Sequence, residues 1–309
     1  MSRPLHRRDT SFILFGLGAE QTSPRSLGLL AAVFFGSLLI AAVLTPPAYW
    51  LVEFWHNQTN SGNAAWLLAK GPDVYFDRLR MAAIILGLPW LMSVCHLWSW
   101  RALGLAPDKC AWRAGLCWWL AGLALIYGLA LWKNSPATTP LATATPGQFL
   151  EALLAGLLLG LLEETIFRGL ILRICYTAAR RPALALAAVS VFYAYTHFKV
   201  PASVWTHVAP GVHWDTGFFV AFWTTCGITE NFDLAQFTAL TLLGLVLGAL
   251  TLRTGSLWSA VGLHAGLVSA LYFYRGSGLA DGWAAVGVLM LILFLVLFVG
   301  QNERATPNT

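Results

Sequence analysis

The stretch Gly160-Leu-Leu-Glu163-Glu164-Thr-Ile-Phe-Arg168-Gly169 places two adjacent glutamates and an arginine inside a run of apolar residues. An almost uncharged segment that begins at Phe149 precedes it, so the whole run is long enough to form a helix within a membrane. Each ionisable side chain near the centre of a bilayer costs about 2.5–3.5 kcal/mol on insertion scales. Three such groups so close together indicate a functional site rather than a purely structural span.

The composition of the whole chain agrees with a membrane location. Of its 309 residues, 58% are hydrophobic and 11% are charged, whereas soluble proteins carry about 25% charged residues. The net charge of +5 is interpreted through its distribution along the chain and not as a sign of nucleic-acid binding. The five cysteines are scattered without a CxxC pair, which indicates neither a disulfide framework nor a zinc ribbon.

The hydropathy pattern predicts an all-α polytopic membrane protein, with about eight transmembrane helices that form a bundle around an intramembrane active site. The first span has no small-residue cleavage site, so we expect a retained helix and not a signal peptide. The predicted spans are 27–45, 81–99, 114–132, 148–172, 183–199, 236–252, 256–275 and 283–300.

The distribution of lysine and arginine predicts that both termini face the cytoplasm. With that orientation, 12 of the 19 basic residues lie in cytoplasmic segments, six lie outside, and Arg168 lies within a span. We divide the chain into an N-terminal region with three spans (1–147), a core that contains the two glutamates (148–300) and a short C-terminal tail (301–309).

Two connections between the predicted spans are long. Residues 46–80 contain Pro46-Pro47 and several charges, which predicts an exterior loop. Residues 200–235 contain an apolar segment, 217–225, that is too short to span comfortably and is expected to be re-entrant or interfacial. No internal repeat is evident, which weakens the interpretation as an inverted-repeat transporter.

Pairs of small residues predict close helix contacts. Gly156 and Gly160 lie on the helix that carries the glutamates, and Gly244 and Gly248 lie on the sixth span. Such small-xxx-small faces let helix backbones approach closely. The glutamates are therefore expected in the interior of the bundle.

The spacing of the charged residues predicts different roles for the two glutamates. Glu164 and Arg168 are spaced i,i+4 and can pair on one helix face. Adjacent helix residues point about 100° apart, so Glu163 projects away from this pair. The glutamate paired with the arginine stays ionised, while Glu163 can act as a general base that activates a water. Two histidines on later spans, His197 and His264, are natural partners.

These residues resemble the three motifs of the CPBP family, the intramembrane endopeptidases that are also described as CAAX prenyl protease-like or Abi proteins. The first motif is Glu163-Glu164-x-x-x-Arg168, the second runs from Tyr193 to His197, and the third is His264 on a later span. The resemblance covers residues 148–275.

The resemblance implies cleavage of peptide bonds within the membrane or at its edge. Carried over to this chain, it makes Glu163 the base, lets His197 position the water and lets His264 stabilise the oxyanion. Glu164 and Arg168 support this geometry. The mechanism needs no metal or other cofactor, although two histidines and one glutamate (His197, His264 and Glu163) could also bind zinc.

The chain departs from the family pattern at two positions. The second motif usually begins with Phe, where this chain has Tyr193, which adds a hydroxyl group. The third motif usually has a polar residue such as Asn four positions after its histidine, where this chain has Val268; neighbouring Ser269 points elsewhere on the helix. A valine cannot donate a hydrogen bond to an oxyanion, and the loss of one such donor costs about 10²–10³-fold in rate. Either His264 acts with another donor, or the chain is a weak or inactive member.

Other polar residues carry weaker signals. His96, on the second span, has no motif partners and is expected to be a packing residue. His207, His213 and Asp215 in the exterior loop could bind a metal, although loops of this kind usually do not.

The sequence therefore predicts an intramembrane endopeptidase that acts on a membrane-anchored protein or peptide, with the lipid bilayer as its other partner and no nucleic acid. A bacterial inner membrane is the expected location. Two alternatives remain open: a non-catalytic immunity or scaffold protein, which Val268 favours, and a proton-coupled transporter.

Overall fold

The computed structural model describes residues 25–95, 97–106, 108–132, 145–179, 181–197, 211–227, 232–273, 287–289, 291–292 and 295. Within these ranges the secondary structure is helical, and no strand is present. The chain forms two compact units: residues 97–194 with 234 onward make unit 1, and residues 23–96 with 195–233 make unit 2. The all-α prediction is confirmed.

Three of the described helices are long and apolar enough to cross a membrane: α1 (Arg25–Thr59), residues Lys109–Leu131 of α4 (Lys109–Trp132), and α11 (Leu234–Thr254). Shorter apolar helices are α8 (Pro182–Tyr195), α10 (Thr216–Cys226) and α12 (Trp258–Phe273). The structure therefore supports the prediction of several membrane-spanning helices but does not confirm the count of eight. Most of the predicted last span, 283–300, lies outside the described residues, as does His96.

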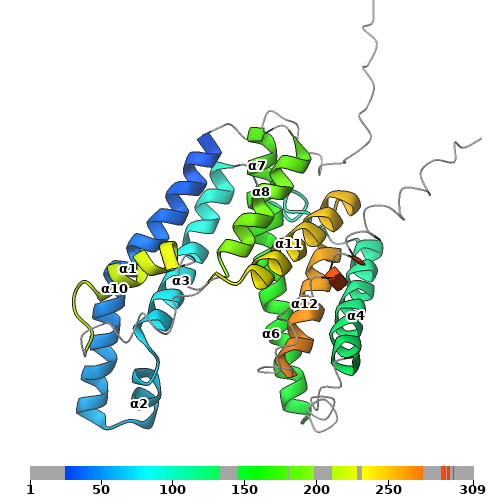
Figure 1. The fold of residues 1–309 in the computed structure, drawn as a ribbon. Helices are drawn as coiled ribbons and strands as arrows, with labels where there is room; N and C mark the ends of the chain where they lie inside the picture. The colour runs from blue at the N-terminus through cyan, green and yellow to red at the C-terminus, as the bar shows by residue number, and fades with distance from the viewer. Residues whose placement is uncertain are drawn as a thin grey trace, which may run out of the picture. The chain divides into compact units, whose positions relative to one another are not determined.

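Unit 1 is built around α12, which lies between α4 and α6 (Pro146–Glu164) (Figure 1). Nearly every α12 residue from Ser259 to Ala270 is buried, as expected of a helix that is apolar all round. Apolar side chains from α4, α11 and α12 form a buried cluster in unit 1, which includes Ile126, Val246, Leu250, Leu263 and Leu267.

Helix α6 begins with a strong capping signal. The Thr145 hydroxyl accepts a hydrogen bond from the Gln148 backbone N–H, and the Gln148 side chain accepts one from the Thr145 backbone N–H. This reciprocal capping box, with Pro146 in the first turn, satisfies donors that a helix start otherwise leaves open. The helical path continues from α6 through a π-helical segment, η1 (Thr165–Ile171), into α7 (Leu172–Ala179).

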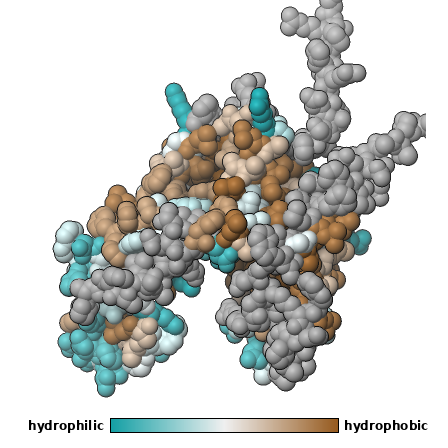
Figure 2. Space-filling model, in the orientation of Figure 1, coloured by the Kyte–Doolittle hydropathy of each residue, from teal (hydrophilic) through white to brown (hydrophobic). Residues whose placement is uncertain are grey.

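Unit 2 contains α1, α2 (Gly62–Leu68), α3 (Pro72–Val94) and α10. The prediction of an exterior loop over residues 46–80 is wrong, because α1 continues through Pro46 and Pro47 to Thr59 and is followed by two more helices. Figure 2 shows hydrophilic residues gathered near α2 and the adjacent end of α1, with hydrophobic residues over much of the other described surface that faces the viewer. The expected polar character of this region is thus carried by helices.

The contact between α1 and α10 explains how a proline pair fits inside a helix. Pro46 has no N–H to donate to the Ala42 carbonyl one turn earlier. That carbonyl faces Gly217 of α10, where an added Cβ would lie only 1.9 Å from the Ala42 oxygen. The Ala42 carbonyl, which lacks its usual N–H donor at Pro46, is thus covered by the backbone of α10 at Gly217. At 11 residues, or about 16 Å, α10 is too short to cross a bilayer core of about 30 Å.

Candidate active site

Glycines bring α6 and α12 close enough for their polar side chains to meet. A Cβ at Gly156 would lie 2.6 Å from the Ala265 carbonyl oxygen, and one at Gly160 would lie 3.0 Å from the Ala265 nitrogen. On the opposite side of α12, a Cβ at Gly262 would lie 1.9 Å from the Gly115 oxygen of α4. The predicted close contact of the glutamate helix is confirmed, and α12 is held between two helix backbones.

The predicted ion pair between Glu164 and Arg168 is present and fully buried. The Arg168 Nη1 donates to Glu164 Oε1 at 2.9 Å. Its Nη2 donates at 3.3 Å to the carbonyl oxygen of Gly244 on α11. Arg168 lies within the π-helical segment, a rare backbone form that is often found at functional sites.

His264 contacts both glutamates, one with each ring nitrogen. Its Nδ1 lies 2.8 Å from Glu164 Oε1, and its Nε2 lies 3.8 Å from Glu163 Oε2. Consecutive helix residues diverge, but the two nitrogens of one imidazole reach side chains that point in different directions. The two glutamates therefore make different contacts, while both still converge on one histidine.

The contact with Glu164 fixes which nitrogen of His264 carries a hydrogen. An ionised carboxylate can only accept, so Nδ1 donates to Glu164. Arg168 donates to the same oxygen of Glu164, Oε1, which agrees with its role as an acceptor. In the neutral imidazole, Nε2 then presents a lone pair toward Glu163; in the imidazolium it presents an N–H. This orientation by a carboxylate is the arrangement that tunes catalytic histidines.

Tyr193 completes the cluster from α8. The hydroxyl of this buried residue is hydrogen-bonded to the side chain of Glu163. Its ring meets that of His264 edge to face, with 6.3 Å between centroids, and the Arg168 guanidinium lies 4.6 Å above it. The motif pattern identified the aromatic ring, but the contact of the hydroxyl with Glu163 could not be read from spacing.

Four of the five predicted site residues therefore come together in unit 1: Glu163, Glu164, Arg168 and His264. His197 lies half-buried in the turn after α8, which ends at Tyr195 and not at residue 199 as predicted. The boundary between the compact units falls after Ala194, so His197 belongs to unit 2 and its role beside the carboxylates stays a prediction.

The described residues contain no group of three or more His, Cys, Asp or Glu side chains placed to hold a metal ion. In the other candidate metal loop, His207 lies outside the described residues. Asp215 directly precedes α10, and the His213 backbone N–H donates to the Thr216 hydroxyl. Within the described part of that loop, these groups form the start of a helix.

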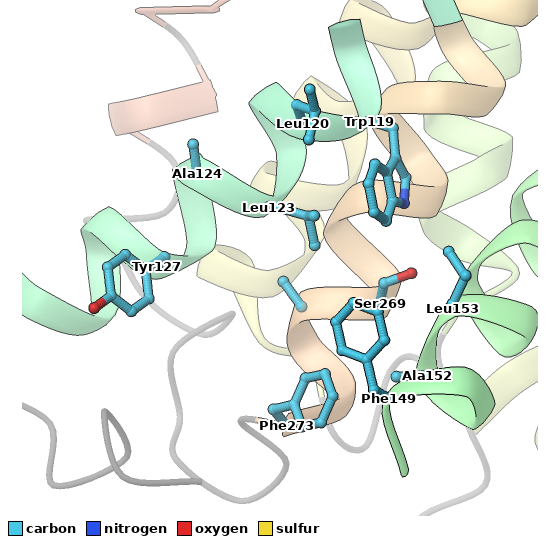
Figure 3. A pocket seen from close by; sticks show the side chains of 11 residues that line it. Trp119, Leu120, Leu123, Ala124, Tyr127, Phe149, Ala152, Leu153, Ser269 and Phe273 are labelled. Atoms are coloured by element: carbon cyan, nitrogen blue, oxygen red, sulfur yellow. The ribbon is translucent and has the colours of Figure 1, made fainter. Parts of the chain in front are cut away.

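An apolar cavity of about 390 Å³ lies beside the other end of the α6–α12 pair, between these helices and α4 (Figure 3). Aromatic side chains line much of it, with Trp119 and Tyr127 on α4, Phe149 on α6 and Phe273 on α12. None of the predicted site residues lines it. Counted at 1.5 Å per residue, it begins about 8 Å beyond His264 along α12.

The helices of this membrane protein thus enclose a buried cluster of glutamate, arginine and histidine, as expected of an intramembrane active site. Residues 145–270 match the model of the type II CAAX prenyl endopeptidase Rce1-like family, and this match supports membership of the CAAX protease (CPBP) family. The matched region contains the three sequence motifs, so the resemblance is confirmed. Searches of curated proteins and of solved structures found no match.

Proposed function

We propose that this chain is an intramembrane endopeptidase that hydrolyses a peptide bond of a membrane-anchored protein or peptide, with Glu163 as the base. The observation that carries the proposal is the pair of atoms Glu163 Oε2 and His264 Nε2, which lie 3.8 Å apart within a buried cluster. A water beside both atoms can hydrogen-bond to each of them. The protease family of the chain supports the same reaction class.

The proposed reaction uses each member of the cluster in a separate role. Glu163 takes a proton from the water as the water oxygen attacks the scissile carbonyl carbon. His264, oriented through Nδ1 by Glu164, turns Nε2 toward the reacting groups and serves the oxyanion, and Arg168 holds Glu164 in place through their ion pair. His197 helps to position the water, as the family resemblance implies. No metal takes part in this mechanism; zinc held by Glu163, His197 and His264 is the competing version.

Val268 favours a second candidate, a non-catalytic immunity or scaffold protein, because it cannot supply the expected hydrogen-bond donor. We place either form in a bacterial inner membrane with both termini in the cytoplasm. The 12-to-6 distribution of basic residues supports this orientation.

Cleavage of membrane-anchored peptides by the protein in reconstituted vesicles tests the proposal. Replacing Glu163 by Gln is expected to lower the rate by about 10²–10⁴-fold, the usual contribution of a general base. The matched control is Glu151→Gln, an exposed glutamate three turns earlier on the same helix, which should cleave at the wild-type rate. Activity that survives a chelator supports the metal-free mechanism, and activity lost on chelation supports zinc. Equal activity in Glu163→Gln and wild type would refute Glu163 as the base.

A further inference from the structure

The hydroxyl of Tyr193 is one of the two features in which this chain differs from the family motifs. The second motif usually begins with Phe, so the aromatic ring is expected and the hydroxyl is an addition. The ring is almost fully buried, at 1% exposure, between Phe167, Arg168 and His264. Its edge-to-face contact with Phe167, with 5.0 Å between centroids, fixes the ring plane. Packing alone would be satisfied by phenylalanine.

The hydroxyl reaches the group that the proposed function makes the base. It is hydrogen-bonded to the Glu163 side chain, and an ionised carboxylate accepts, so the phenol donates. A buried donor with a charged acceptor is one of the stronger hydrogen bonds in proteins. The phenol therefore contacts the proposed base directly, through the side chain of Glu163.

The second departure from the family removes a donor. Val268 lies one turn after His264 on α12, at the position where the resemblance places a polar residue such as Asn. Its side chain has no group that can hydrogen-bond to the developing oxyanion. The chain therefore lacks one donor at Val268 and has gained another at Tyr193.

We propose that the Tyr193 hydroxyl is a catalytic residue that donates to the oxyanion in place of the missing polar residue at position 268. The inference rests on the proposed function, because it needs Glu163 to act as the base. It assigns a role to a hydroxyl group that the three motifs do not require.

The proton and electron movements of the step explain how one hydroxyl serves two acceptors. As the water oxygen bonds to the carbonyl carbon, one water proton moves to Glu163 and the C=O electron pair moves onto the carbonyl oxygen. Glu163 becomes neutral and is a weaker acceptor, while the carbonyl oxygen becomes negative, so the phenol O–H turns to that oxygen. When the tetrahedral intermediate collapses, the C–N bond breaks and the proton on Glu163 moves to the leaving nitrogen. Tyr193 keeps its proton throughout.

Paired substitutions test the inference. Tyr193→Phe keeps the ring packing and is expected to lower kcat by about 10²–10³-fold with KM unchanged, because an oxyanion donor acts only in the transition state. Tyr193→Phe/Val268→Asn should regain most of the lost rate, since the amide restores a donor one turn after His264. The matched control is Tyr195→Phe on the same helix, whose hydroxyl donates to the Thr225 carbonyl within unit 2 and which should keep kcat near the wild-type value.

The outcomes separate this inference from the proposed function. Wild-type kcat in Tyr193→Phe would overturn the inference and leave Glu163 as the base, as Glu163→Gln would still be inactive. A loss in Tyr193→Phe that Val268→Asn does not restore would also overturn it, because the hydroxyl would then only position Glu163. No cleavage by the wild type on any substrate would overturn both. Thermal unfolding in the same detergent checks that each variant is folded.

Discussion

The two ends of the α6–α12 pair differ in polarity and in packing. At one end, Glu163, Glu164 and His264 form a buried polar cluster with Arg168 from the π-helical segment that follows. At the other end, the helices border an apolar cavity of about 390 Å³ whose rim is aromatic. Glycine contacts in between hold the backbones together. The same pair of helices therefore provides a site for chemistry and a hollow for an apolar group.

The contrast shows what each kind of surface requires inside a membrane. Ionised groups are costly in a medium of low dielectric constant unless partners of opposite charge or hydrogen-bond partners surround them. Arg168 has both, from Glu164 and from the Gly244 carbonyl. The residues that line the cavity are uncharged, and most are apolar side chains that lipid and apolar substrate atoms can contact directly. Changes at the polar end should therefore cost more than changes at the cavity.

The largest effect on stability is expected from breaking the buried ion pair. Replacing Arg168 by Met leaves the Glu164 charge buried without its cation, which costs about 3–5 kcal/mol in comparable pairs. The double variant Glu164→Leu/Arg168→Met removes both charges and should recover much of that stability, yet remain inactive because His264 loses its acceptor. Thermal unfolding of both proteins in one detergent measures the difference. If the single and double variants unfold at the same temperature, the pair does not have the energetic role inferred from its burial.

The polar cluster also shows what the sequence could and could not predict. The i,i+4 spacing of Glu164 and Arg168 predicted their contact, because the spacing of side chains along a helix is a local property. The contact of His264 with Glu164 links residues 100 positions apart and depends on the close approach of α6 and α12. The order of the motifs identified His264 as a candidate, but which of its nitrogens contacts which carboxylate depends on how the helices pack.

Local rules failed where tertiary packing overrides them. Pro46-Pro47 predicted a break, but the helix continues where α10 presents Gly217 to the Ala42 carbonyl. In the same way, α4 lies outside the region that carries the motifs, yet its backbone contacts α12 at Gly262. Such contacts follow from the three-dimensional arrangement and have no signature within either segment alone.

An intermediate effect is expected from forcing the two helices apart. Gly156→Ala puts a Cβ 2.6 Å from the Ala265 carbonyl oxygen, and overpacking of this kind costs about 1–3 kcal/mol. Cleavage should also fall, because α12 carries His264 and would move away from Glu163. Gly128→Ala on α4 is the control: its Cβ meets nothing within 4 Å, and alanine favours a helix over glycine by about 1 kcal/mol. Unfolding temperatures that fall equally in both variants would contradict the inferred close contact.

The smallest effect is expected at the apolar cavity. If the apolar part of a membrane-anchored substrate enters it, Ala124→Phe should fill the space and raise KM by up to about tenfold, which corresponds to about 1.4 kcal/mol, with little change in kcat. Ala124 lines the cavity (Figure 3), whereas Ala121 is an exposed alanine on the same helix that does not, so Ala121→Phe should leave KM unchanged. The measurement is the cleavage rate as a function of the mole fraction of substrate in the bilayer. Equal KM values in the two variants would mean that the substrate reaches Glu163 without using the cavity, and the difference between the two ends of the helix pair would then concern packing alone.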